Sequence, residues 1–308
     1  MQISIGTSIS QLKGGAAAPA APWLIQGGTW NDAGVWDDSE TWDDGAVSWT
    51  TPDIANASYD SVSFSVTNEE GSPSGLFFKP DGAKMYVIGY SNDVVAEYDL
   101  STSWDVSTAV VNQTTSISAQ EGVSMDLFFK PDGTKMYIVG QDTDNVYEYD
   151  LSTAWDISTK TYNSNSLAVG SQENTPRAMF FKPDGTKMYI VGPQNDTVYQ
   201  YALSTAWDVS TGSFETGKTF SVTSQDTQPQ GLFFSPDGTT MFVSGNTTDS
   251  VYKYTLSTAW DVSTASYASE SVDLSSENAA IDGVFFKPDG SKMYVIGLVG
   301  DTVYQYST

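Results

Sequence analysis

The chain has 308 residues, and 38 acidic against 13 basic side chains leave a formal net charge of −25. Such a surface keeps a protein in solution and repels nucleic acids and anionic membranes, so neither is an expected partner. The sequence holds no cysteine and no histidine. This excludes disulfides, thiol nucleophiles, Ser-His-Asp triads and imidazole-bound metals. The chemistries that remain open rest on carboxylates, tyrosines, lysines or hard metal ions.

The first 48 residues differ in composition from the rest of the chain. Residues 14–22 are rich in glycine, alanine and proline, which is typical of a linker, and three tryptophans beside acidic residues follow, at Trp30, Trp36 and Trp42. We predict that residues 1–48 form a separate anchoring segment that docks through these tryptophans. A small meander packed on the main domain and calcium binding by the paired aspartates remain open. Neither a secretory signal nor a transmembrane helix is expected.

A repeat of about fifty residues fills the remainder of the chain. The tripeptide Pro-Asp-Gly recurs at spacings of 51 to 53 residues, each time between a Phe-Phe pair and a Met-Tyr or Met-Phe strand. Its copies begin at Pro80, Pro131, Pro183, Pro236 and Pro288. A Trp-Asp pair follows four of the copies, at Trp104, Trp155, Trp207 and Trp260. We interpret these tryptophans as packing between repeats.

Each repeat contains four strand patterns, which is typical of a propeller blade. The first strand is a buried apolar run that ends in Phe-Phe, and the Pro-Asp-Gly turn follows it. The next strands contain Met-Tyr and Tyr-x-Tyr, and an outer strand completes the repeat. The last repeat stops after its third strand, and residues 64–67 match the fourth strand of another repeat. We therefore predict an all-β, five-bladed β-propeller over residues 49–308, closed by pairing of its N- and C-terminal strands. An open solenoid is the alternative.

The core x-Phe-x-Pro-Asp-Gly-x-x-Met-Tyr-Val resembles the YVTN/NHL-type propeller repeats. The longer unit, with Tyr-x-Leu-Ser-Thr-Ala-Trp-Asp-Val-Ser-Thr, resembles repeats in tail and fibre-like virion proteins of marine bacteriophages. That resemblance implies a homo-oligomer located in an extracellular particle, with other virion proteins as partners of residues 1–48.

An acid lies ahead of each Phe-Phe pair, with six or seven residues between the acid and the pair, and we predict a ring of five carboxylates at the channel mouth. The five are Glu70, Glu121, Glu173, Asp226 and Glu277. Oxygen ligands of this kind suit Ca²⁺ or Mg²⁺, so a cation near the axis is one interpretation. In the other, each acid caps backbone amides of its own loop. No other cofactor is expected.

A second set of positions differs from blade to blade, as a recognition surface does. One member of the set lies just ahead of each Phe-Phe pair, at Ser74, Met125, Arg177, Gln230 and Asp282. The loops between second and third strands add Tyr90, Asn92, Asp142, Asn195 and Asn246. Arg177 is the only arginine in the chain. We predict that these residues bind a ligand, with pairing of Arg177 to an acid of the ring as the alternative.

These expectations together favour a non-enzymatic virion structural protein that presents its propeller for attachment to a host-surface glycan. One alternative is a purely architectural capping or decoration protein without a ligand. The other is a carboxylate-dependent glycosidase, which needs non-equivalent acids at the channel. On the first strands, only Asp126 and Asp282 are acids without an acidic counterpart in the other repeats.

Overall fold

The computed structural model describes residues 29–30, 36–37 and 48–308, in two units that span Met1–Val47 and Ser48–Thr308. The described part of the first unit is a pair of short antiparallel strands, β1 (Thr29–Trp30) and β2 (Trp36–Asp37), with Trp30 opposite Trp36. Trp42, the third predicted anchor, lies outside the described residues.

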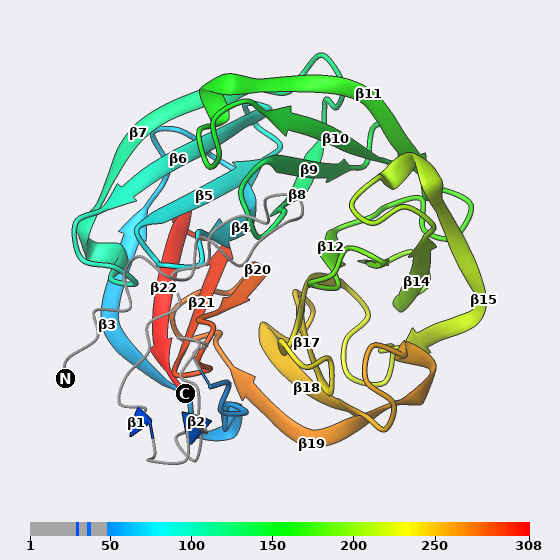
Figure 1. Cartoon of the computed structure of the whole chain (residues 1–308). Coiled ribbons are helices and arrows are strands. Elements are labelled where there is room, and N and C mark those ends of the chain that lie inside the picture. Colours follow the sequence, from blue (N-terminus) through cyan, green and yellow to red (C-terminus); the bar gives the residue numbers. More distant parts are fainter. Residues whose placement is uncertain (1–28, 31–35, 38–47) are drawn as a thin grey trace. The chain divides into compact units, whose positions relative to one another are not determined.

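The second unit is a ring of five four-stranded antiparallel sheets, which confirms the predicted five-bladed propeller (Figure 1). Blade 1 contains β4 (Pro73–Phe78), β5 (Lys84–Gly89), β6 (Val94–Leu100) and β7 (Ala109–Ser116). Blade 2 contains β8 (Ser124–Phe129), β9 (Lys135–Gly140), β10 (Asn145–Leu151) and β11 (Lys160–Ala168). Blade 3 contains β12 (Ala178–Phe181), β13 (Lys187–Gly192), β14 (Thr197–Leu203) and β15 (Gly212–Ser221).

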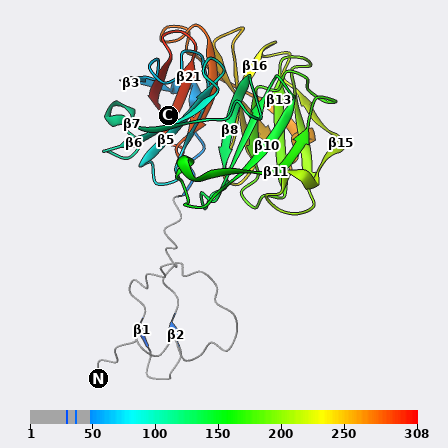
Figure 2. The same cartoon turned by 90° about the horizontal axis from the view of Figure 1, so that it is seen from above.

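Blade 4 contains β16 (Pro229–Phe234), β17 (Thr240–Gly245), β18 (Ser250–Leu256) and β19 (Ala265–Asp273). Blade 5 combines both ends of the unit, in the order β20 (Ile281–Phe286), β21 (Lys292–Gly297), β22 (Thr302–Ser307) and β3 (Ser58–Ser65). Single 3-10 turns precede the outer strands: η3 (Ile54–Asn56), η4 (Val106–Thr108), η5 (Ile157–Thr159), η6 (Val209–Thr211) and η7 (Val262–Thr264). A view at right angles to the first shows the blades standing side by side (Figure 2).

The strands differ in burial as their sequences predict. Five of the six residues of β5 are fully covered and β4 is buried throughout, because neighbouring blades cover both faces of the inner strands. The outer strand β7 is largely exposed, and exposed and half-buried residues alternate in its second half, from Asn112 to Ser116. Its period of two places one face against the neighbouring blade and the other in solvent.

The Pro-Asp-Gly turn requires its glycine. In blade 2, Gly133 has a φ of 73°, in the left-handed region that favours glycine. The indole of Trp155 lies over it, and a Cβ built there would be 2.4 Å from that ring. Trp155 also stacks on Phe77 of blade 1, with ring centroids 6.4 Å apart, and its carbonyl accepts a 2.7 Å hydrogen bond from the Tyr86 hydroxyl. The tryptophans thus pack between blades, as predicted.

The ring closes through the N-terminal strand of the unit. β3 pairs with β22, with Phe64 opposite Val303 and Tyr59 opposite Tyr306. Trp49 supplies the tryptophan that blade 5 lacks, since it stacks on Phe233 with centroids 6.2 Å apart. Trp49 is not part of a Trp-Asp pair, because three residues separate it from Asp53, the aspartate that precedes η3.

Candidate functional site

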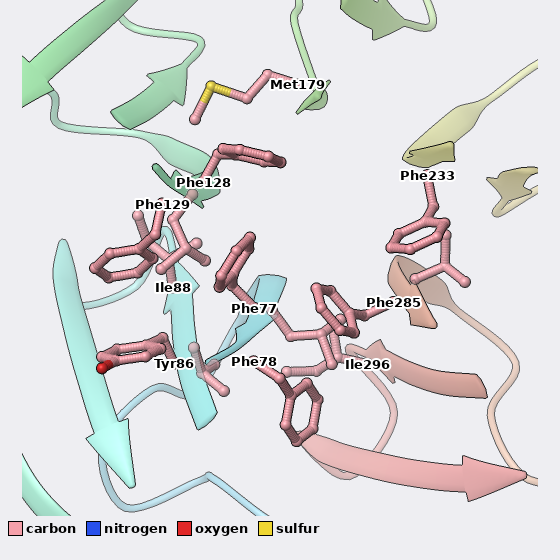
Figure 3. Close-up of a cluster of buried hydrophobic side chains, with 14 of the residues drawn as sticks. Phe77, Phe78, Tyr86, Ile88, Phe128, Phe129, Met179, Phe233, Phe285 and Ile296 are labelled. Atoms are coloured by element: carbon pink, nitrogen blue, oxygen red, sulfur yellow. The ribbon is translucent and has the colours of Figure 1, made fainter. Parts of the chain in front are cut away.

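Five phenylalanines, one from the inner strand of each blade, fill the central channel. Neighbouring ring centroids lie 5.2 to 5.4 Å apart, with interplanar angles of 68° to 71°. The members are Phe77, Phe128, Phe180, Phe233 and Phe285, four of which are labelled where they gather in Figure 3. The cavity that remains between the inner strands has a volume of about 20 Å³, enough for about one water molecule. Because the phenylalanines touch one another around the axis, they close the channel, and a ligand larger than water would have to lie at the mouth, where the inner strands begin.

A single carboxylate, Asp126, projects among small residues on that side. The equivalent positions of the other blades are Gly75, Ala178, Gly231 and Gly283. A Cβ on Gly75 would lie 2.6 Å from Asp126 Oδ1, so the blades leave space for one larger side chain. Oδ1 accepts from Leu127 N at 2.8 Å and Oδ2 from Met179 N at 2.9 Å. Asp126 therefore joins blades 2 and 3, while burial raises its pKa to about 7 against these two bonds.

The predicted variable positions do meet at the channel mouth, at the start of each inner strand. Ser74, Met125, Gln230 and Asp282 are buried, and Arg177 is half-buried. Ser74 Oγ donates to the Ser124 carbonyl at 3.3 Å, which ties blade 1 to blade 2. β12 begins one residue after Arg177 and is two residues shorter than the other inner strands.

The Arg177 guanidinium lacks a charged partner in the described part of the chain. Nη1 lies 3.2 Å from Met125 Sδ, and Nε is buried without a hydrogen-bond acceptor. Burial lowers the pKa of Arg177, and the nearby carboxylates of Asp282 and Glu173 oppose that shift. The predicted alternative, an ion pair with an acid of the ring, is not formed. Arg177 thus keeps free hydrogen-bond donors at the mouth.

Asp282 is the matching acid, on blade 5. The residue is 3% exposed, and its Oδ2 has no hydrogen-bond partner. Burial raises its pKa to about 7, although Arg177 and the Asn246 side chain both favour the charged form. A carboxyl that is half ionised near neutral pH, with a free oxygen, can accept a proton from water. Asp282 and Arg177 thus place a base and a cation near each other at the channel mouth, although neither lines the cavity between the inner strands.

The predicted ring of five carboxylates does not form. Glu70 is fully buried in its loop, where Oε1 accepts from Ser72 N and Ser91 N, both at 3.0 Å. Glu121, Glu173 and Asp226 bind loop amides in the same way. Within residues 48–308 and the two short strands, no three acids lie close enough to share a metal ion. Each of these four acids thus links the loop before the first strand of its blade to the loop between the second and third strands.

The fifth position was assigned one residue too early. Asn278, which is 2% exposed, occupies the capping place in blade 5 and accepts from Ala280 N at 3.0 Å. Glu277 instead lies where the other blades have Glu69, Gln120, Gln172 and Gln225, whose side chains accept from a tyrosine hydroxyl. Its own partner is the Tyr306 hydroxyl at 3.5 Å. Asn278 lies seven residues before Phe285, as Glu70 does before Phe77, so an even count would have found it. Glu277 was chosen because it is an acid, although it lies eight residues before Phe285.

The loop residues divide into two groups. Asn246 acts on Asp282, and Tyr90 is near enough to Arg177 to influence its pKa. Asn92 and Asn195 donate their side-chain amides to carbonyls of the adjacent entry loop, at 2.8 and 3.3 Å, and Asp142 is exposed. Asp126, absent from the predicted ligand residues, belongs to the site. It could have been recognised as the one acid at a position otherwise held by glycine or alanine.

The chain was compared with known proteins. A family model described as "Lactonase, 7-bladed beta-propeller" matches residues 9–271. No curated protein matches the sequence. A functionally unknown protein from Desulfotomaculum acetoxidans DSM 771 is 16% identical, with a TM-score of 0.45, over 73% of this chain and 62% of that one. A putative 6-phosphogluconolactonase from Bacteroides fragilis NCTC 9343 is 14% identical, with a TM-score of 0.47, over 73% and 64%. The chain thus spans less than two thirds of either protein.

The family match overturns the predicted function. The model that covers most of this chain describes an enzyme, so the interpretation as a non-enzymatic virion protein with a glycan-attachment role is wrong. The architectural and glycosidase alternatives do not follow from it either. No comparison supports the phage resemblance or a virion location. In the described part of the chain, no helix is long and apolar enough to cross a membrane.

Proposed function

Because the chain belongs to the lactonase family of β-propellers, we propose that it hydrolyses a small polar lactone at the channel mouth. The observation that carries the proposal is that two oppositely charged side chains at the mouth influence each other's pKa, while each keeps a buried atom without a hydrogen-bond partner. Asp282 keeps a buried oxygen without a partner and Arg177 a buried Nε without one. Buried polar atoms are seldom left unpaired, so the two invite a ligand that bonds to both.

The chemistry assigns one role to each group. The Asp282 carboxylate takes a proton from a water molecule whose oxygen attacks the lactone carbonyl carbon. The Arg177 guanidinium stabilises the negative charge that develops on the carbonyl oxygen. When the ring C–O bond breaks, the proton on Asp282 passes to the departing alkoxide. The product is the open-chain hydroxy acid, and no other reactant is consumed.

The surroundings favour a small substrate held at the rim. The phenylalanine ring blocks the channel, so the lactone lies between the inner-strand starts and the loops. Five blades, where the family is described as seven-bladed, bring the inner strands closer to the axis. Asn246 orients Asp282, and the hydroxyl and amide of Ser74 and Gln230 are the nearest neutral polar groups of the same ring of positions.

A panel of five- and six-membered sugar lactones tests the proposal through acid release, with spontaneous hydrolysis subtracted. Asp282→Asn should lower kcat/KM by about 10² to 10⁴, the range for loss of a general base. Arg177→Gln should lower it by about 10² to 10³. For the wild type, kcat/KM should rise with pH through about 7 as Asp282 ionises. The control Asp150→Asn changes an exposed carboxylate near the end of β10, opposite Lys135 and thus at the Pro-Asp-Gly end of its blade, away from the mouth.

Two results would reject the proposal. One is hydrolysis by the wild type that does not exceed that of Asp282→Asn on any lactone. The other is a loss in Asp150→Asn as large as in the two mouth variants, because the effect would then follow from folding and not from the site.

A further inference from the structure

The outer strands of the propeller are sheet edges, and four of the five carry two protective features. Each of these four contains a charged residue and a bulge with a residue at positive φ. The bulge residues are Ser61 in β3, Ser164 in β11, Gly217 in β15 and Ser269 in β19. Charges and bulges on an edge strand discourage pairing with another chain.

The outer strand of blade 1, β7, lacks a charged residue, and its bulge contains no residue at positive φ. Its sequence, Ala-Val-Val-Asn-Gln-Thr-Thr-Ser, holds no charged residue, and no residue in it has a positive φ. Its single register shift, opposite Glu97 and Tyr98, leaves one extra residue. Val110 is 66% exposed and Val111 43%, and Val299 is the one other large apolar side chain exposed to this degree in the described residues. β7 lies on the perimeter of the ring, hydrogen-bonded to β6 on one side (Figure 1).

We propose that β7 is a dimerisation edge, which pairs with β7 of a second copy of this chain about a twofold axis. A twofold axis makes the two strands antiparallel, so that each copy satisfies the outward N–H and C=O groups of the other. The partner must be uncharged along its strand, and β7 itself meets that condition. Any other outer strand of this chain would bring charges into the pair. The exposed valines would be covered in the same step.

The net charge sets a distinctive salt dependence. Two chains of formal charge −25 repel each other, while the contact itself contains no ion pair to be screened. The screening length falls from about 10 Å at 0.1 M salt to about 3 Å at 1 M. Dimerisation through β7 therefore strengthens as salt is added, which is the opposite of an interface built on salt bridges.

Sedimentation of the full chain at several concentrations and salt levels tests the proposal. The wild type should pass from monomer to dimer with rising concentration, with a lower Kd at high salt. Val110→Glu should weaken the dimer roughly tenfold or more, because it charges the strand and removes apolar surface. The matched control is Thr161→Glu in β11. Val110 and Thr161 occupy equivalent places, opposite Asp99 and Asp150, each of which binds a lysine.

The control should dimerise like the wild type, and both variants should melt as cooperatively as it does. A wild type that stays monomeric under all conditions overturns the proposal. So does a Val110→Glu dimer as stable as that of Thr161→Glu, since the contact would then lie elsewhere. Lactone hydrolysis is measured separately on the monomer. A failure to dimerise therefore does not affect the test of the proposed activity.

Discussion

The buried carboxyl of Asp282 should make the protein less stable as the pH rises through neutrality. Burial raises its pKa from 3.8 to about 7, so the folded chain keeps a proton that the unfolded chain releases at lower pH. The stability linked to this proton is fully present below the unfolded pKa and is lost as the pH rises through the folded one. At about 1.4 kcal/mol per unit, a shift of about three units amounts to about 4 kcal/mol.

Asp282→Asn removes the titration and keeps the shape of the side chain. The free energy of unfolding of the variant, minus that of the wild type, should rise by about 2 to 4 kcal/mol between about pH 4 and pH 8. Urea unfolding at a series of pH values measures this difference, provided that both chains unfold in two states. Asp126 titrates in the same range but is present in both proteins. A difference that stays constant with pH would refute the assignment of Asp282 as a buried acid with a raised pKa.

Two further predictions concern the blade scaffold. Gly133→Ala should lower the free energy of unfolding by roughly 2 to 4 kcal/mol, because its Cβ would lie 2.4 Å from the Trp155 indole at a φ of 73°. Thermal melting against Gly71→Ala, where nothing lies within 4 Å of the new Cβ, checks this, and equal melting temperatures would contradict it. Glu121→Gln should cost roughly 1 to 3 kcal/mol in chemical denaturation, because its buried carboxylate accepts backbone N–H groups of two loops. Glu277→Gln, outside the capping place, should cost much less, and the reverse order would show that the capping assignment is wrong.

Local sequence patterns determined the architecture. Each blade repeats one set of turn and strand signals, and short-range preferences decide such signals: glycine at positive φ in the turn and aromatic pairs on buried strands. The blade count and the closure follow because an outer strand is missing at one end of the chain and present at the other. The positions at the channel mouth could also be predicted, because equivalent residues of the repeats occupy equivalent places in the blades.

Tertiary structure decided what those positions do. Repeat spacing aligns Asn278 with Glu70, and the structure shows that this residue, and not the acid Glu277 beside it, caps the loop of blade 5. Asp126 is the one large side chain at its level because the five inner strands converge and leave space for a single carboxylate. The sequence of one repeat does not show this limit on space. Arg177 and Asp282 are 105 residues apart in sequence, and each influences the pKa of the other only when the ring closes. Their pKa shifts arise from burial by neighbouring blades, and burial is a property of the assembled ring.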